Sequence, residues 1–190
     1  MRKLIIGMHS SLDGFVAGPK GEMNWIKVDA EMFDFVGTIT QKADAALYGR
    51  VTYEMMQSYW PTAGDPPDAS KHDKEHSAWY NRVPKVVLST TMTQEGLEKT
   101  TVISDNLTDN INKIKSQEGK DIMIFGSPRA SHSLMNEGLI DEFWIFVNPV
   151  LLGQGIPLFK DITEITKLKF VESKTFSCGV IGLHYESLVN

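Results

Sequence analysis

The sequence predicts an α/β fold built on a mostly parallel mixed sheet. Three apolar strands in the first two thirds of the chain each end in glycine or hydroxyl residues, and helical spacings alternate with the strands. The last third differs, because it leads into an antiparallel hairpin expected over residues 167–176 and 180–186. Alternating strands and helices favour parallel pairing, so only this C-terminal part is expected to be antiparallel.

The composition suits one globular domain spanning residues 1–190, with 42% hydrophobic and 23% charged residues. A formal net charge of −5 leaves no basic surface for nucleic acid or an anionic membrane, so neither is expected as a partner. The single cysteine, Cys178, rules out a disulfide framework. The apolar run at residues 4–8 is too short for a signal peptide, and we expect a cytoplasmic protein.

The stretch around which the chain is organised is residues 43–54. A short apolar run predicts a buried strand, Gly49 ends it, and the residues from Arg50 onward follow a helical spacing. At such a junction, free backbone N–H groups and the positive end of the helix dipole can hold an anion. Gly49 permits close approach of a ligand, Arg50 adds a planar cation suited to phosphate, and Thr52 adds a hydroxyl. A glycine turn followed by a solvated arginine is the alternative from this stretch alone.

The segments on either side of this stretch supply a second strand, a loop and a helix. Residues 4–9 predict an apolar strand that continues through a glycine-containing loop, in which Asp13 is interpreted as a turn residue that bonds nearby backbone. Residues 29–40 have a helical spacing with one buried face. Residues 61–73 are rich in proline, glycine and aspartate and predict an excursion without regular structure, either a lid or a surface loop.

Two further strands end as the central strand does. Residues 83–91 predict an apolar strand that ends in hydroxyl side chains placed to receive a phosphate. Residues 121–125 predict a third buried strand, closed by residues 126–129, where Ser127 would cap a helix and Pro128 would take its first position. We interpret all three ends as strand-to-helix junctions at the carboxyl edge of the sheet, where open α/β sheets bind ligands. A dinucleotide would engage more than one of them.

Other side chains give weaker signals. His72 and His76 are spaced for zinc on a helix, but the charged residues between them indicate a solvated helix start, and no metal is predicted. The sequence contains no Gly-x-Ser-x-Gly elbow and no Walker loop that would indicate a hydrolase or a kinase. Four aromatic side chains could line a flat ligand, although core packing is their more frequent role: Trp25, Phe33, Trp60 and Trp144.

Five motifs, in order along nearly the whole chain, resemble the dihydrofolate reductase-like family, and more closely its branch related to the reductase domain of bacterial riboflavin biosynthesis. They are Ser11–Gly14, Leu47–Glu54, Leu88–Ser89, Gly138–Glu142 and Pro149–Phe159. The resemblance implies a three-layer α/β sandwich with NADPH lying across the sheet edge. It also implies the cofactor contacts: Gly49, Arg50 and Thr52 at phosphates, Ser89 and Thr90 near the adenosine 2′-phosphate, Phe125, Gly126, Ser127 and Arg129 at the pyrophosphate turn, and Ala17 and Gly18 at the nicotinamide.

The chain departs from this family at two places. The family turn often has two adjacent glycines, whereas Gly126 is followed here by Ser127. Dihydrofolate reductases carry an acidic residue at a position that aligns with Ala30, and its neighbour Asp29 is our candidate proton donor. Trp25 and Phe33 are the candidate substrate contacts on the same resemblance.

These observations together predict an NADPH-dependent reductase of a small heterocycle, either pterin-like or ribosylaminopyrimidine-like. The alternatives are a ligand-binding or regulatory module that kept the fold without turnover, and a flavin-linked reductase. Phe143 and Trp144 point to opposite faces of one strand, so both faces need cover. The resemblance favours a second subunit on one of them, and we expect a homodimer built on the C-terminal third.

Overall fold

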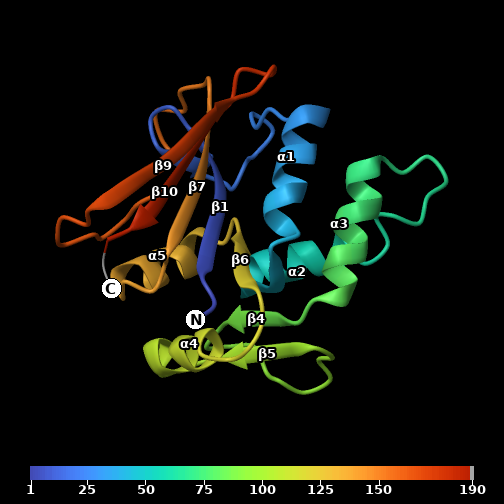
Figure 1. Ribbon diagram of the computed structural model, residues 1–190, viewed down its shortest axis with the longest axis vertical. Coiled ribbons are helices and arrows are strands. Elements are labelled where there is room, and N and C mark those ends of the chain that lie inside the picture. Colours follow the sequence, from blue (N-terminus) through green and yellow to red (C-terminus); the bar gives the residue numbers. More distant parts are fainter. Residues whose placement is uncertain (189–190) are drawn as a thin grey trace.

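The computed structural model describes residues 1–188, and its main feature is an eight-stranded sheet in the order β5-β4-β3-β6-β1-β7-β10-β9 (Figure 1). The strands of this sheet are β1 (Leu4–Ser11), β3 (Ala43–Gly49), β4 (Lys85–Leu88), β5 (Thr100–Ile103), β6 (Asp121–Phe125), β7 (Glu142–Asn148), β9 (Leu168–Thr175) and β10 (Ile181–Ser187). The short strands β2 (Phe15–Ala17) and β8 (Ile156–Pro157) pair with each other outside it.

Six neighbouring strands, β5 to β7 in the sheet order, run parallel, and β10 and β9 follow as an antiparallel hairpin. The predicted mostly parallel mixed sheet with its C-terminal hairpin is therefore confirmed. All six parallel strands point their carboxyl ends to one edge, called the carboxyl edge below, and their starts to the opposite, amino edge.

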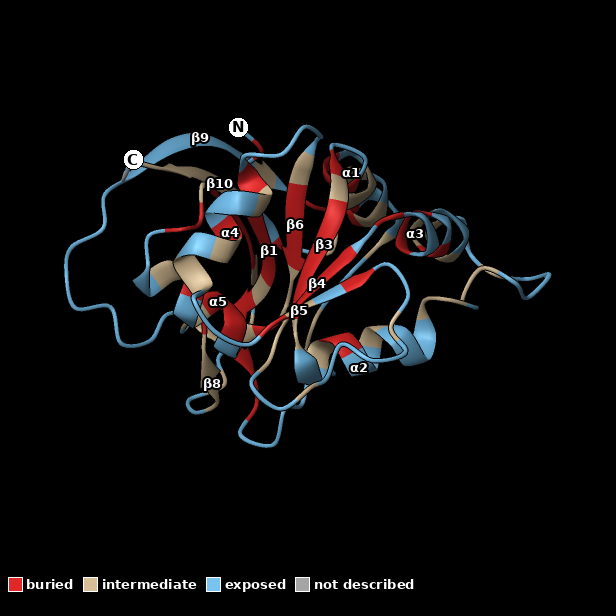
Figure 2. Ribbon diagram, turned by 90° about the horizontal axis from the view of Figure 1, so that it is seen from below, coloured by how far each residue is buried: buried red, intermediate tan, exposed pale blue. Residues whose placement is uncertain are grey.

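Helices cover both faces of the sheet, so the core has two layers of side chains (Figure 2). Buried residues of α1 (Ala30–Thr40), α2 (Arg50–Tyr59) and α3 (Lys71–Arg82) pack on one face, and those of α4 (Leu107–Lys115) and α5 (Pro128–Asn136) pack on the other. Successive side chains of a strand point to opposite faces of the sheet, so each strand contributes to both layers. In the central strand β3, Leu47 joins the core on the α4 and α5 side, while Tyr48 joins the core on the α1 to α3 side. None of these helices is long and apolar enough to cross a bilayer, within the part of the chain that the structure describes.

The predicted excursion over residues 61–73 is shorter than expected. Helix α3 begins at Lys71, because Ser70 and Asp73 form a reciprocal capping box. The hydroxyl of Ser70 accepts the Asp73 N–H at 3.0 Å, and the Asp73 carboxylate in turn accepts the Ser70 N–H at 3.3 Å. Asp73 therefore belongs to a helix start, which composition alone did not distinguish from loop.

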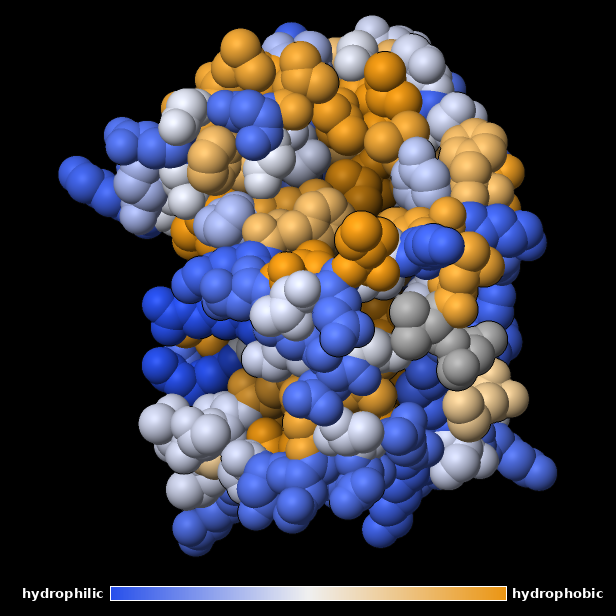
Figure 3. All heavy atoms as spheres, turned by 90° about the vertical axis from the view of Figure 1, so that its left-hand side faces the viewer, coloured by the Kyte–Doolittle hydropathy of each residue, from blue (hydrophilic) through white to orange (hydrophobic). Residues whose placement is uncertain are grey.

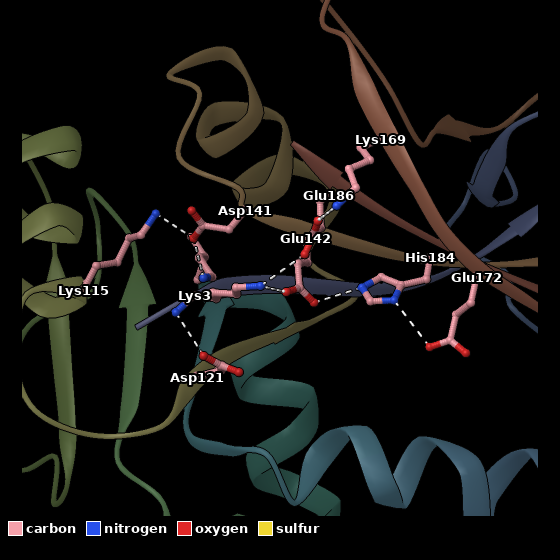
Figure 4. A network of polar contacts seen from close by, with 10 residues as sticks. Lys3, Lys115, Asp121, Asp141, Glu142, Lys169, Glu172, His184 and Glu186 are labelled. Atoms are coloured by element: carbon pink, nitrogen blue, oxygen red, sulfur yellow. Dashed lines mark hydrogen bonds and ion pairs between the residues drawn. The ribbon is translucent and has the colours of Figure 1, made fainter. Parts of the chain in front are cut away.

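Paired charges hold the amino edge together (Figure 4). Lys115, at the end of α4, is buried and forms an ion pair with Asp141 at 2.6 Å. Lys3 forms an ion pair with Glu142, which also contacts Nε2 of His184 at 2.9 Å. These contacts join the starts of β1 and β7 to α4 and to the C-terminal hairpin.

Candidate functional site

The carboxyl ends of β3 and β6 form two junctions that are hydrogen-bonded to each other. Gly49 ends β3 and is the N-cap of α2, while Ser127 follows β6 and is the N-cap of α5. The backbone N–H of Gly49 donates to Oγ of Ser127 at 3.1 Å. A Cβ atom added at Gly49 would lie 3.4 Å from Cβ of Ala130, so the first turns of the two helices lie side by side. We call Gly49, Thr52, Gly126 and Ser127 the linked junction.

The turn between β6 and α5 is left-handed at two consecutive residues. Gly126 has φ 60° and Ser127 has φ 57°. Glycine adopts this conformation freely, whereas for a serine it is unfavourable. Where the family turn often has a second glycine, this chain has Ser127, which adopts the left-handed conformation that favours glycine. A Cβ atom added at Gly126 would lie 3.8 Å from Cγ2 of Thr52, which places this turn against the start of α2.

Ser127 was predicted to cap α5, but its hydroxyl does not do so. Ser127 occupies the N-cap position and Pro128 the first helical position, but the serine side chain makes no capping hydrogen bond. Its Oγ accepts the Gly49 N–H instead. Within residues 1–188, the first turn of α5 therefore has no side-chain cap.

Helices that start at the carboxyl edge fall into two groups. The helices α2, α4 and α5 each follow a parallel strand and begin without a side-chain cap. The helices α1 and α3 begin at long loops and are capped by Asp29 and Ser70. Uncapped first turns present free N–H groups and the positive end of the helix dipole, which favour anions.

Two arginines flank the linked junction. Nη1 of Arg50 donates to the Glu54 carboxylate at 2.9 Å, and the Arg50 side chain is 43% exposed. Arg129, in the first turn of α5, is exposed and makes no ion pair with any residue in the range 1–188. Both guanidinium groups are accessible to an anion that approaches this edge.

Ser89 and Thr90 follow β4, which lies beside β3 in the sheet. Thr90 is exposed, while Oγ of Ser89 accepts the Thr91 and Met92 N–H groups at 3.2 and 3.0 Å. The prediction of a strand-to-helix junction here was wrong, because this segment runs through a loop to the edge strand β5. In this loop the side chain of Gln94 donates to the Thr100 carbonyl and accepts the Val102 N–H of β5.

Ala17 and Gly18 lie under the glycine-rich loop around Gly155. Both are buried, and a Cβ atom at Gly155 would run into the carbonyl of Ala17. Asp13 holds the same loop, because its carboxylate accepts the Gly153 N–H at 2.7 Å. Hydrogen bonds from the Ser11 hydroxyl and the Gly153 N–H lower the pKa of Asp13. Its role is structural, as predicted, but the backbone it bonds lies far along the chain.

Asp29 is the N-cap of α1, and both its carboxylate oxygens are occupied. They accept the N–H groups of Met32 and Cys178, each at 2.8 Å. These bonds, led by that of Met32, lower the pKa of Asp29. A carboxylate held ionised in this way has little tendency to carry the proton that a general acid must donate. Trp25 lies nearby in the chain and donates its Nε1–H to the Glu22 carbonyl at 3.0 Å.

Phe33 belongs to a cluster of rings between α1 and α3 that the sequence did not reveal. Its ring stacks on His72 with centroids 4.0 Å apart, and His76 lies 4.1 Å from Trp60 and 5.5 Å from Phe125. We call these five residues the ring cluster. His72 and His76 are half-buried rather than solvated, because their four-residue spacing places both on the inner side of α3. The four-residue spacing of the two histidines, next to Trp79 and Tyr80, was the sequence signal from which their burial could have been predicted.

Comparison with known proteins identifies the family. Residues 2–182 match the family described as RibD C-terminal domain. The chain belongs to this family. Among the relatives of this chain, YyaP of Bacillus subtilis (strain 168) is 35% identical over 97% of this chain and 94% of its own length. YwjB of the same bacterium is 30% identical over 97% of each chain. Both relatives are described as uncharacterized.

Solved structures confirm the dihydrofolate reductase-like fold. A putative riboflavin biosynthesis protein from Shewanella sp. PV-4 has a TM-score of 0.72 and 25% identity, over 97% of this chain and 98% of that chain. The Thermotoga maritima deaminase and 5-amino-6-(5-phosphoribosylamino)uracil reductase has a TM-score of 0.68 and 14% identity, over 98% of this chain and 56% of that chain. The chain thus corresponds to about half of that bifunctional protein, and the predicted branch of the family is confirmed.

Proposed function

We propose that the protein is an NADPH-dependent reductase of a small heterocycle, pterin-like or ribosylaminopyrimidine-like. The observation that carries the proposal is the linked junction, in which two uncapped helix starts meet at the carboxyl edge of a RibD reductase-type fold. Two adjacent anion-binding helix starts suit a pyrophosphate, since each can hold one phosphate group.

The residues at this edge fit the parts of NADPH. Gly49 and Gly126 allow a close approach of the pyrophosphate, Arg50 and Arg129 add positive charge, and Ser89 with Thr90 would meet the 2′-phosphate. Among the described residues, Arg50 is bonded only through Nη1, to Glu54, so its Nη2 is available for such a contact. The cofactor supplies the hydride, so the protein needs only to orient the two reactants and exclude water. Ala17 and Gly18 would lie at the nicotinamide.

Cofactor binding tests this proposal directly. Titration of the purified protein with NADPH and with NADH, followed by nucleotide fluorescence, should give a lower Kd for NADPH. If neither nucleotide binds, the proposal fails. If both bind equally well, Arg50, Ser89 and Thr90 do not contact a 2′-phosphate.

The second candidate is a ligand-binding or regulatory module on the same fold. It is favoured by one observation, the use of both Asp29 oxygens in capping α1, which leaves that position without a free acid. NADPH oxidation in the presence of pterins, pyrimidines and flavins separates the two candidates. Steady oxidation with any of these compounds would exclude the module, and tight binding without oxidation would exclude the reductase. A yellow purified protein would indicate a flavin-linked enzyme instead.

We also propose that the protein forms a homodimer in the C-terminal third, through the exposed apolar side chains of β9 and β10. The Trp144 face of β7 is covered within the chain, since Phe35 of α1 packs on Trp144 at 5.2 Å. The Phe143 face continues onto β10 and β9, where apolar side chains are exposed, among them Phe170 at 55%. Figure 3 shows apolar atoms gathered on this side of the molecule. A groove of about 280 Å³ runs among Phe143, Leu183 and Tyr185.

Exposed apolar area of this kind marks an interaction surface, and a two-fold dimer is the commonest way to bury one. Light scattering coupled to size exclusion should give twice the 21.3 kDa of one chain. Phe170→Glu should shift the mass to one chain, because it places a charge in the interface. A monomeric wild-type protein would contradict the proposal.

A further inference from the structure

The groove on the α5 side of the sheet has one wall that is fixed by hydrogen bonds. Its volume is about 280 Å³, and side chains of β1, β7 and β10 line it together with Leu158 and Phe159. The backbone of Leu158 is held at both ends. Its N–H donates to the Gly14 carbonyl at 2.8 Å, and its carbonyl lies 3.1 Å from Nε2 of His132. Sites for small molecules are usually formed in this way before the ligand arrives.

Ser10 supplies a polar group without a partner inside this groove. Its side chain lies on the α5 side, because strand side chains alternate and Met8 packs in the core on that side. Ser10 is only 3% exposed and lines the groove, yet its hydroxyl forms no hydrogen bond within residues 1–188. The neighbouring Ser11 hydroxyl, by contrast, accepts the Phe15 N–H at 2.9 Å. Polar groups that are withdrawn from water are normally paired, so the Ser10 hydroxyl points to a ligand.

The lining of the groove selects an uncharged and mostly apolar molecule. Among the described residues, no charged side chain lines it, and Phe143, Ile145 and Leu158 form much of its buried surface. An ordered water needs about two to four polar partners, which is more than the Ser10 hydroxyl offers. A cavity of roughly 150 Å³ accommodates benzene in a protein interior. A groove of about 280 Å³ therefore has room for two fused rings.

Residues 160–167 are placed to cover a molecule in the groove. They join Phe159 to Leu168, both of which line the groove, and they contain no helix or strand. All of them are exposed, including Ile165 at 93% and Ile162 at 46%. Each isoleucine is three residues from one end of the segment's anchors, so each lies within roughly 10 Å of the rim. Closure over a bound molecule would bury both isoleucines.

We propose that the groove is a binding site for a small, uncharged molecule of one or two aromatic rings. Ser10 pairs with its one polar group, and residues 160–167 fold over it. The ring cluster packs on the opposite face of the sheet, so binding here requires neither NADPH nor the linked junction. A second subunit would reach exposed side chains such as Phe170, which does not line the groove, whereas Ser10 is recessed.

The probes are 2-naphthol, naphthalene and 2-naphthoate, which share one ring system and differ in their polar group. NMR titration at pH 7, followed at the methyl signals of Ile145 and Leu183 in the groove, gives each Kd and locates the ligand. The Kd for 2-naphthol should be at least about fivefold below that for 2-naphthoate, because an unpaired carboxylate is costly to bury.

Variants of serine test the hydrogen bond. Ser10→Ala should raise the 2-naphthol Kd at least about threefold, the loss expected for one hydrogen bond. It should leave the naphthalene Kd unchanged, which also shows that the variant keeps its groove. Ser58→Ala is the matched control, since Ser58 is exposed on α2, and it should change neither Kd.

Hydrogen exchange measures the cover. Exchange of the backbone amides in residues 160–167 should slow when 2-naphthol is added to the wild-type protein. The inference is overturned if 2-naphthol does not bind or if 2-naphthoate binds equally well. It is also overturned if Ser10→Ala keeps the wild-type Kd, if the methyl signals do not shift, or if exchange in residues 160–167 is unchanged.

The same samples keep this inference apart from the reductase and the dimer. Saturating NADPH should leave the 2-naphthol Kd unchanged, and competition between them would place the probe in the cofactor site and overturn the inference. Phe170→Glu should bind 2-naphthol as the wild type does, and a loss would mean that one chain does not form the site. Binding of 2-naphthol without any binding of NADPH would contradict the reductase alone.

Discussion

The amino and carboxyl edges of the sheet use polar groups in opposite ways. At the amino edge, charged side chains are paired with one another, as Lys115 is with Asp141 and Lys3 is with Glu142. At the carboxyl edge, the helices that follow parallel strands begin uncapped, and Ser127 turns its hydroxyl to Gly49 rather than to its own helix. Side chains thus fix the sheet at one end and leave backbone donors free at the other. Variants at the two edges should therefore separate stability from binding.

The largest effect is expected at the amino edge, from Lys115→Met. Lys115 is 5% exposed, and its Nζ contacts Asp141 and the Leu139 carbonyl at 2.6 and 3.2 Å. Methionine keeps the apolar stem but leaves the carboxylate and the carbonyl without the ammonium group. Breaking a buried pair on one side is costly, and we expect a loss of about 3 kcal/mol in the free energy of unfolding. Urea denaturation measures it.

Lys169→Met is the matched control, since Lys169 pairs with Glu186 on the same edge but is 64% exposed. An exposed pair contributes little, so its removal should cost less than about 1 kcal/mol. The affinity of either folded variant for NADPH should equal that of the wild type. A loss of affinity with Lys115→Met would mean that the two edges are not independent.

The sequence predicted the fold more accurately than it predicted the contacts of the candidate site. Strand β6 has the predicted bounds, Asp121–Phe125, because an apolar run ended by glycine is a strong local signal. The start of α3 at Lys71 was missed, since a capping box looks like loop composition until the helix beyond it is known. The hydroxyl residues after β4 were likewise predicted to lead into a helix, whereas they lead into a loop before β5.

The site was predictable only where backbone and local sequence define it. Gly49 and Gly126 were identified because a strand that ends in glycine before a helix is a local pattern. The hydrogen bond from Gly49 to Ser127 joins residues 78 positions apart, and no local pattern reports it. The ring cluster depends likewise on α1 and α3 packing together, which brings Phe33 onto His72.

A smaller effect is expected at the carboxyl edge from Arg50→Ala. If Arg50 makes a charge-assisted contact with a phosphate, its loss should weaken NADPH binding by roughly 1–3 kcal/mol. Stability should hardly change, because the side chain is 43% exposed and its pair with Glu54 is a surface contact. Fluorescence titration at low salt measures the Kd, and Arg82→Ala, at the far end of α3, is the control. An unchanged Kd would remove Arg50 from the site.

The smallest effect concerns the capped helix α1 and the role of Asp29. Hydrogen bonds from Met32 and Cys178 lower the folded-state pKa of Asp29. A group with a depressed folded pKa contributes stability that is present above its unfolded pKa, about 3.9, and is lost as pH falls through the folded value. Asp29→Asn keeps an acceptor at the N-cap but cannot titrate. The wild type should therefore have a higher Tm than the variant near pH 6, and the difference should shrink as pH falls toward 2. The same variant tests the chemistry, since a capping role predicts that NADPH oxidation by any substrate found is retained, whereas a proton donor at Asp29 predicts that oxidation is lost while NADPH still binds.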